Sequence, residues 1–322
     1  MITSRAFKTN QPYDALLGRL SHQSVRKHFD AYDDIAWDTP EFHIDPADPI
    51  WQKHDDDPLG RTEWYRSLPE AQRARLGLHL TCTQMRTGVE FEGILSKGLL
   101  EFASTQTVGA SEFRYAYHEV IEEAQHSLMF QEFINRAGLP VRGLTGWDLL
   151  TSRRVHKFGR TFPEFFFLFV LAGEVPIDYS QRSDLASGHP LHPLLRRIMQ
   201  IHVTEEARHL CFAHNYLRQH VPKLSAYRKF ILRVRAPFIF KVMSQLMLKP
   251  PKRIIREYSI PKSVIREAYT DNPVHRQHLQ DGLASVRELC TELGIITPNF
   301  LRVWKRLGVW PKQPAGLLQS GS

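Results

Sequence analysis

The longest amphipathic pattern in the chain runs from Pro69 to Ser104 and predicts one long helix. Its apolar side chains recur at the spacing of a single helix face; they are Leu78, Met85, Leu95, Leu99 and Phe102, with Cys82 and Val89 between them. Glu92 falls inside this apolar stripe. Because an unpaired carboxylate on a buried face is costly, we expect Glu92 to bind a metal ion. Glu90 shares a face with charged side chains and stays the alternative for this role.

Three further segments predict long helices. Residues 110–137 form the second, which ends at the stop signal Gly138-Leu139-Pro140. Thr161-Phe162-Pro163 opens the third, whose run from Phe165 to Leu171 is apolar all round and predicts a buried helix. From Asp178 to Pro193 we expect a loop, and Pro193 then opens the fourth helix, which runs to about Gln219. Shorter helices are predicted around 12–30, 61–67, 146–158, 261–269, 274–293 and 297–307.

These helices predict an all-α protein built on a four-helix bundle, with additional helices at both ends of the chain. Residues 1–68, rich in Asp and Pro, predict a polar arm with short helices. Residues 69–222 form the predicted bundle core. Residues 223–322 form a predicted basic helical extension that packs on the bundle.

The second and fourth helices carry nearly the same motif, Glu-Glu-Ala-x-His. It places Glu123 three residues before His126, and Glu206 three residues before His209. Side chains at this spacing lie on one helix face, about one turn apart. Each helix can therefore offer a carboxylate and an imidazole to one metal ion.

A single glutamate precedes each motif at a similar distance. Glu92 lies 31 residues before Glu123, and Glu174 lies 32 residues before Glu206. The chain therefore contains a pseudo-repeat, in which a helix with one glutamate is followed by a helix with a Glu-x-x-His pair. Such a repeat helps to define the architecture. Bundles that hold two metals combine one glutamate from each of two helices with a Glu-x-x-His pair from each of the other two. The pattern therefore predicts a di-metal core.

His202 extends the stripe on the fourth helix, because it lies four residues before Glu206 and seven before His209. The predicted metal ligands are Glu92, Glu123, His126, Glu174, His202, Glu206 and His209. Oxygen and nitrogen donors without thiolate favour iron or manganese over copper(I). Zinc sites rarely need seven ligands. Four carboxylates also balance the four positive charges of two divalent ions.

This ligand set resembles that of the AurF-type di-iron oxygenases, the p-aminobenzoate N-oxygenase family, whose mark is the third histidine. By motif, the resemblance covers about residues 70–220. It implies a ferritin-like bundle with two Fe ions, with Mn as the alternative metal, O2 as co-substrate and an external electron donor. The implied reaction oxidises an aryl amine to a hydroxylamine or nitro compound. A di-iron hydroxylase or desaturase, or a non-catalytic iron-binding helical protein, stays an alternative.

Composition and the remaining motifs indicate the compartment and the kinds of partner to expect. The 322 residues carry a net charge of +8 and three scattered cysteines, which suits a reducing cytoplasm. We find no signal-peptide pattern, and the most apolar run, Phe165 to Gly173, is far shorter than the ~20 residues that span a bilayer. No glycine-rich phosphate loop or zinc-like cysteine spacing is visible. We expect a small-molecule substrate and a redox partner but no nucleic acid, and homodimer formation stays open.

The segment from Lys223 to Arg256 contains ten Lys or Arg and no Asp or Glu, interleaved with apolar residues. Such a helix can lie on a membrane surface or pack on the protein with a cationic outer face. We favour packing, and peripheral membrane contact through 223–256 is the alternative.

Overall fold

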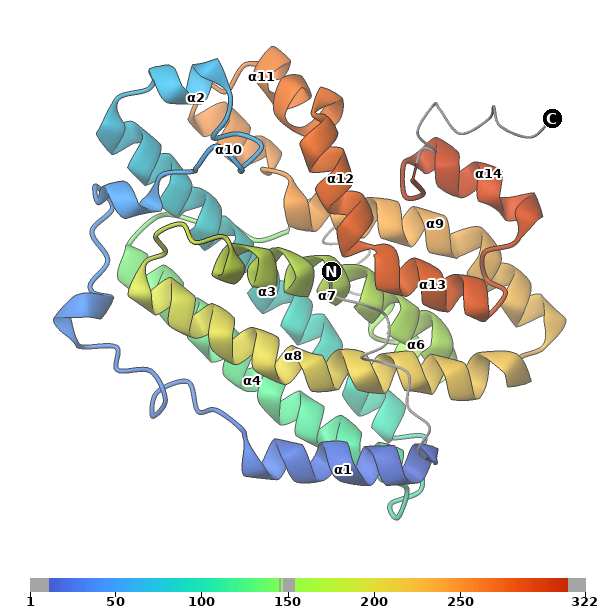
Figure 1. Cartoon of the computed structure of the whole chain (residues 1–322). Coiled ribbons are helices and arrows are strands. Elements are labelled where there is room, and N and C mark those ends of the chain that lie inside the picture. The colour runs from blue at the N-terminus through green and yellow to red at the C-terminus, as the bar shows by residue number, and fades with distance from the viewer. Residues whose placement is uncertain (1–11, 145, 147–153, 312–322) are drawn as a thin grey trace.

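The computed structural model describes residues 12–144, 146 and 154–311, and these contain helices and no strand. Four long helices form the centre of the molecule (Figure 1): α3 (Glu70–Ala103), α4 (Ser111–Ala137), α7 (Pro163–Ala186) and α8 (Pro193–His220). Helix α3 packs against α4 and α7 against α8, and contacts of α4 with α8 and of α3 with α7 join the two pairs. The prediction of an all-α bundle is therefore confirmed.

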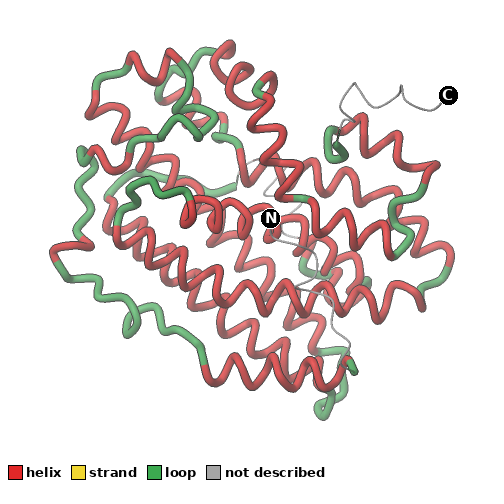
Figure 2. Tube along the Cα trace, viewed as in Figure 1, coloured by secondary structure: helices red, strands yellow, loops and turns green. Residues whose placement is uncertain are grey.

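The ends of these helices follow local sequence signals. Helices α7 and α8 each begin with a proline, which tolerates the first turn because its missing N–H needs no partner there. Helix α4 ends at Gly138, whose φ of 63° lies in the left-handed region that glycine adopts without strain. Short loops connect α3 to α4 and α7 to α8, whereas a long loop follows α1, as the tube in Figure 2 shows.

The expected loop from Asp178 to Pro193 is wrong in its first half, because α7 continues to Ala186. Pro176 lies inside the helix and removes one backbone donor. The turns beyond it are held by Arg182, which contacts Asp178 at 2.8 Å and donates to the Val203 carbonyl of α8 at 2.6 Å. Glu174 consequently lies within a helix and not at its end.

Two apolar clusters enclose the middle of the bundle. One contains an aromatic group in which the Phe167 ring centroid lies 5.2 Å from that of Phe102 and 4.4 Å from that of Tyr216. The other includes Trp51 and Phe133, with ring centroids 5.9 Å apart. Along α3, α4 and α8, the predicted ligand positions fall between residues of the first cluster and residues of the second. Apolar packing thus shields both ends of a polar layer from water.

Shorter elements surround the bundle. On the N-terminal side they are α1 (Tyr13–Arg26), which packs on α4 and α8, the 3-10 turns η2 (Pro40–Phe42) and η3 (Pro49–Trp51), and α2 (Glu63–Ser67). Helix α6 (Phe158–Thr161) precedes α7, and most of the helix predicted at 146–158 lies outside the described residues. The C-terminal elements are η4 (Val221–Lys223), α9 (Ala226–Leu248), α10 (Lys252–Glu257), α11 (Lys262–Arg266), η5 (Glu267–Asp271), α12 (Pro273–Gly282), α13 (Ala284–Glu292) and α14 (Pro298–Leu307).

The basic segment contains α9 and most of α10, and α9 packs along α7. Leu232, Phe240 and Met243 are buried on its inner side, whereas Tyr227 and Phe238 are exposed. Contact of this outer side with a membrane surface stays an untested alternative. The three sequence regions with boundaries at 68 and 222 stay predictions. In the described part of the chain, no helix combines the length and the apolar character needed to cross a membrane.

Candidate metal centre

The seven predicted ligands come together in the middle of the bundle, and we call them the ligand cluster. Helix α3 contributes Glu92 and α7 contributes Glu174, while the other five come from α4 and α8. Each of the seven is at most 2% exposed. Six of them form three overlapping groups, in each of which one ligand atom per residue lies within 4.8 Å of the others: Glu92, His126 and His202; Glu123, His126 and Glu206; and Glu174, His202 and Glu206. The seventh, His209, places its Nδ1 3.2 Å from Oε1 of Glu123 and 3.1 Å from Oε1 of Glu206.

The two Glu-x-x-His pairs have nearly the same geometry. Nδ1 of His126 lies 3.2 Å from Oε2 of Glu123, and Nδ1 of His209 lies 3.1 Å from Oε1 of Glu206. Both imidazoles therefore direct Nδ1 to the carboxylate on their own helix. His202 instead points Nε2 inward, at 3.6 Å from Oε1 of Glu92.

Several atoms of the ligand cluster lack a hydrogen-bond partner among the described residues. They include Oε2 of Glu92, Oε2 of Glu206 and Nδ1 of His202. A buried oxygen or nitrogen without a partner costs about 1–3 kcal/mol, and more when it is charged. Divalent cations bound to these oxygens would remove that cost. The donor set and the unpartnered oxygens thus fit two metal ions.

The electrostatics of the ligand cluster also favour binding of a cation. Burial raises the pKa of Glu92, Glu174 and Glu206, and the neighbouring carboxylates raise it further. Burial would lower the pKa of His126, but hydrogen bonds to two carboxylates raise it to about 10. Without metal, Glu92, Glu174 and Glu206 therefore bind protons more readily than ordinary carboxyl groups do, and bound metal ions would displace those protons.

Two further carboxylates, to which the sequence gave no role, bind the ring nitrogens of His209 and His126 that face away from the ligand cluster. Oε2 of Glu122 accepts a hydrogen bond from Nε2 of His209 at 2.7 Å, and Oε2 of Glu205 accepts one from Nε2 of His126 at 3.0 Å. Each is the first glutamate of a Glu-Glu-Ala-x-His motif, and each bonds to the histidine of the other helix. Such partners orient a metal-binding imidazole and raise its basicity. The doubled glutamate in both motifs was the signal for this role.

Arg208 links these two outer carboxylates. Its Nη2 donates to Oε1 of Glu122 at 2.8 Å and to Oε1 of Glu205 at 3.4 Å. Phe29, in the loop after α1, donates its backbone N–H to Glu205 at 3.2 Å. The Arg208 guanidinium thus compensates the negative charge of Glu122 and Glu205, two carboxylates that do not belong to the ligand cluster.

The geometry also separates the two candidate glutamates of α3. Glu90 faces away from the ligand cluster, accepting hydrogen bonds from Arg86 at 3.0 Å and from the Leu144 backbone N–H at 2.7 Å. Glu92 is the carboxylate that faces His202. The alternative assignment of Glu90 therefore has no support from its position.

An apolar cavity of about 70 Å³ lies beside this part of α3. Its lining consists of Thr87, Phe91, Ile94, Leu144, Val155, Phe169, Val242, Met243, Leu246 and Met247, none of which is charged. Phe91 directly precedes Glu92, and its ring packs on Gly173, which directly precedes Glu174. A Cβ at Gly173 would lie 2.3 Å from Cζ of Phe91, so this contact requires glycine. The cavity thus reaches Phe91, the residue before Glu92, and Phe91 in turn contacts the residue before Glu174.

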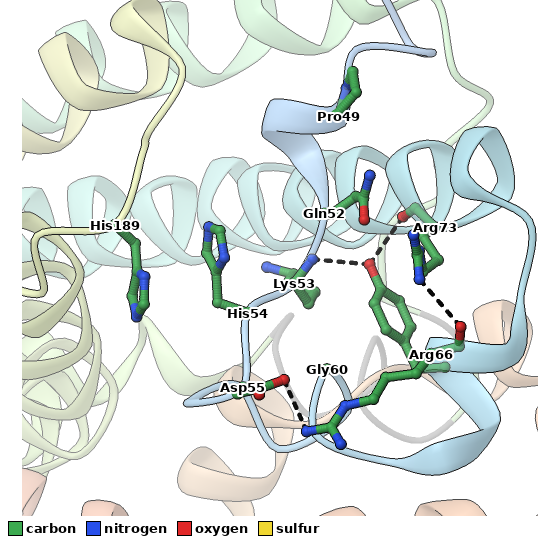
Figure 3. A pocket seen from close by; sticks show the side chains of 10 residues that line it. Pro49, Gln52, Lys53, His54, Asp55, Gly60, Arg66, Arg73 and His189 are labelled. Carbon is green, nitrogen blue, oxygen red and sulfur yellow. Dashed lines mark hydrogen bonds and ion pairs between the residues drawn. The ribbon is translucent and has the colours of Figure 1, made fainter.

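A larger pocket of about 510 Å³ lies elsewhere, near the N-terminal end of α3 (Figure 3). Arg66 pairs with Asp55 at 2.8 Å, and the rings of His54 and His189 stack with centroids 4.4 Å apart. The lining residue Arg73 precedes Glu92 by 19 residues on α3, a distance of about 28 Å along the helix axis. This pocket is therefore separate from the ligand cluster.

The sequence comparisons agree with the geometry. The family described as "P-aminobenzoate N-oxygenase AurF" matches residues 10–294. The chain is 38% identical over 293 residues to the uncharacterized protein Rv0885 of Mycobacterium tuberculosis and to the uncharacterized protein Mb0909 of Mycobacterium bovis. These alignments cover 91% of this chain and 86% of each relative. The chain therefore belongs to the p-aminobenzoate N-oxygenase AurF family, a family of di-iron oxygenases.

Proposed function

We propose that this protein is a non-haem di-iron oxygenase that oxidises the nitrogen of a small aromatic amine with O2. The observation that supports this most strongly is the buried ligand cluster of four carboxylates and three imidazoles in a chain of the AurF family. Two bound ferrous ions would supply two electrons to O2. An external donor would then restore the reduced state.

The residues of the chain would perform three tasks around such a centre. The ligand cluster would hold the ions, and its four carboxylates would balance their four positive charges. Glu122 and Glu205 would fix the orientation of His209 and His126. The apolar clusters on both sides would exclude water, which protects an oxidising centre from side reactions.

The apolar cavity beside Phe91 supports an aromatic, uncharged substrate. Its lining offers apolar and aromatic contacts and the hydroxyl of Thr87. Arg86, the residue before Thr87, donates to Glu90 at 3.0 Å. In the first oxidation, one oxygen atom would form the N–O bond of a hydroxylamine. The other would leave as water, using two electrons and two protons.

Metal loading tests this proposal directly. After anaerobic loading with Fe(II), we expect two irons per chain, and we expect a transient visible absorption band when O2 is added. Aryl amines would then be screened for hydroxylamine and nitro products by mass spectrometry. One metal or none per chain, without a response to O2, would contradict a di-iron oxygenase. Oxygen consumption without any amine product would instead favour hydroxylation or desaturation.

Two variants sharpen the test. Glu206→Ala should lose metal and activity while the bundle stays folded, because Glu206 takes part in two of the three ligand groups. His202→Ala should retain part of the metal and change the iron spectrum. Unchanged iron content in the first variant, or an unchanged spectrum in the second, would remove that residue from the metal site.

A further inference from the structure

Helix α4 carries a further buried carboxylate beside the ligand cluster. Glu119 is 1% exposed, and within the described structure neither of its carboxylate oxygens has a hydrogen-bond partner. Its oxygen lies within 4.8 Å of ligand atoms of Glu123 and His209, with which it forms a fourth group of potential metal-binding side chains. The sequence interpretation gave Glu119 no role.

The positions on α4 and α8 correspond residue by residue. Glu119 lies four residues before Glu123 and seven before His126. His202 has the same spacing to Glu206 and His209. Glu119 thus occupies on α4 the position that His202 occupies on α8, and both side chains lie on the inward stripe of their helix.

The contacts across the bundle obey the same correspondence. The His202 ring lies beside His126 of the opposite helix, with ring centroids 4.6 Å apart. Glu119 likewise lies beside His209 of the opposite helix. The outer pairs, Glu122 with His209 and Glu205 with His126, cross between the helices in the same manner. Glu119 is therefore part of the symmetry of the site.

No described side chain donates a hydrogen bond to Glu119. His209, the nearest imidazole, has its Nε2 bonded to Glu122 and its Nδ1 directed to Glu206. The other close charged groups are themselves carboxylates, those of Glu122, Glu123 and Glu206. A buried carboxylate in this position is costly unless a cation lies next to it.

We propose that Glu119 is an eighth metal-binding residue, whose carboxylate binds the divalent ion held by His209 and Glu123. This inference rests on the proposed di-metal centre. It makes the two metal positions unequal, because α8 supplies a neutral imidazole where α4 supplies an anionic carboxylate. The additional negative charge strengthens binding of the ion on the His209 side.

Titration of the metal-free protein with Co(II) tests this inference through binding and absorption spectra. The unaltered protein should bind two ions. Glu119→Gln should bind one ion with little change and the other at least about tenfold more weakly, the size of effect seen when groups around a metal site are lost. Because an indirect effect can reach the same size, the Co(II) d–d spectrum of the weakened site must also change. Glu119→His, which places an imidazole where α8 has His202, should restore two-ion binding with a third, distinct spectrum.

Glu164→Gln is the matched control. Glu164 is also buried, at 7% exposure, and has an unpartnered Oε2, but it lies outside the ligand groups. Its substitution should leave both affinities and the spectrum unchanged. Two ions bound by Glu119→Gln with unchanged affinities and spectrum would overturn the role of Glu119 and leave the di-metal centre intact. Absence of Co(II) binding in the unaltered protein would instead overturn the di-metal centre itself.

Discussion

The crossed pairs between α4 and α8 allow a quantitative test of how the site is held. Glu122→Gln and Glu205→Gln each remove one negative charge but keep an oxygen that can accept the histidine N–H. The shape of the site is therefore preserved, and the variants report on charge and orientation. Each should weaken metal binding without abolishing it.

The magnitude follows from the contacts. Loss of an outer partner of a metal ligand typically costs 10–100-fold in affinity, which is about 1.4–2.7 kcal/mol. Glu122 should lie at the upper end, because its oxygens lie 2.7 Å from Nε2 of His209 and 2.8 Å from Nη2 of Arg208. Glu205 should cost less, because the corresponding distances are 3.0 Å to His126 and 3.4 Å to Arg208.

The double variant tests whether Arg208 couples the two pairs. Since Arg208 donates to both carboxylates, either substitution alone lets the guanidinium move toward the remaining one. The two effects should therefore not add, and groups that share a partner typically show interaction energies of about 0.5–3 kcal/mol. Strict additivity would mean that Arg208 does not link the pairs.

The assay is competition for Co(II) between each variant and a chelator of known affinity. Glu112→Gln is the control, because Glu112 of α4 pairs with His220 of α8 at 2.9 Å but lies outside the ligand cluster. Its affinity for Co(II) should stay within threefold of that of the unaltered protein. If Glu122→Gln also stays within threefold, the crossed pairs do not tune the metal-binding histidines, and the reasoning fails.

Two further predictions concern the stability of the fold. Burial raises the pKa of Glu119 to about 8, and against the effect of burial, hydrogen bonds to carboxylates raise that of His126 to about 10. Both groups bind protons more tightly in the folded state, so the free energy of unfolding of the metal-free protein should fall as the pH rises from about 6 to 9. Urea unfolding at both pH values measures this free energy, and a higher value at pH 9 would contradict the prediction. Gly173→Ala places a Cβ 2.3 Å from Cζ of Phe91 and should destabilise the protein by about 1–3 kcal/mol. Gly93→Ala is the control: its Cβ would have no atom within 4 Å, so it should be neutral or stabilising by up to about 1 kcal/mol. Equal losses of thermal stability in the two alanine variants would refute this reasoning.

The sequence by itself determined the four long helices and the glutamates and histidines proposed as ligands at their centre. Apolar spacing, Pro at helix starts and Gly138 at a helix end act within a few residues of the chain, so that they can be recognised without the fold. The Glu-x-x-His spacing is of this kind too, because one helix turn places both side chains on one face. The helix beyond Pro176 was missed because its support, the contact of Arg182 with the Val203 carbonyl, comes from another helix.

Only the tertiary structure decided which side chains meet between helices. Periodicity assigns a residue to a face of its own helix, but it does not say what lies opposite. The crossed bonds of Glu122 and Glu205 depend on how α4 packs against α8. The choice of Glu92 over Glu90 depends on the position of Leu144, to which Glu90 is bonded. The proposed metal-binding role of Glu119 also depends on helix packing. A buried carboxylate without a hydrogen-bond partner can be recognised only when the neighbouring helices are in place.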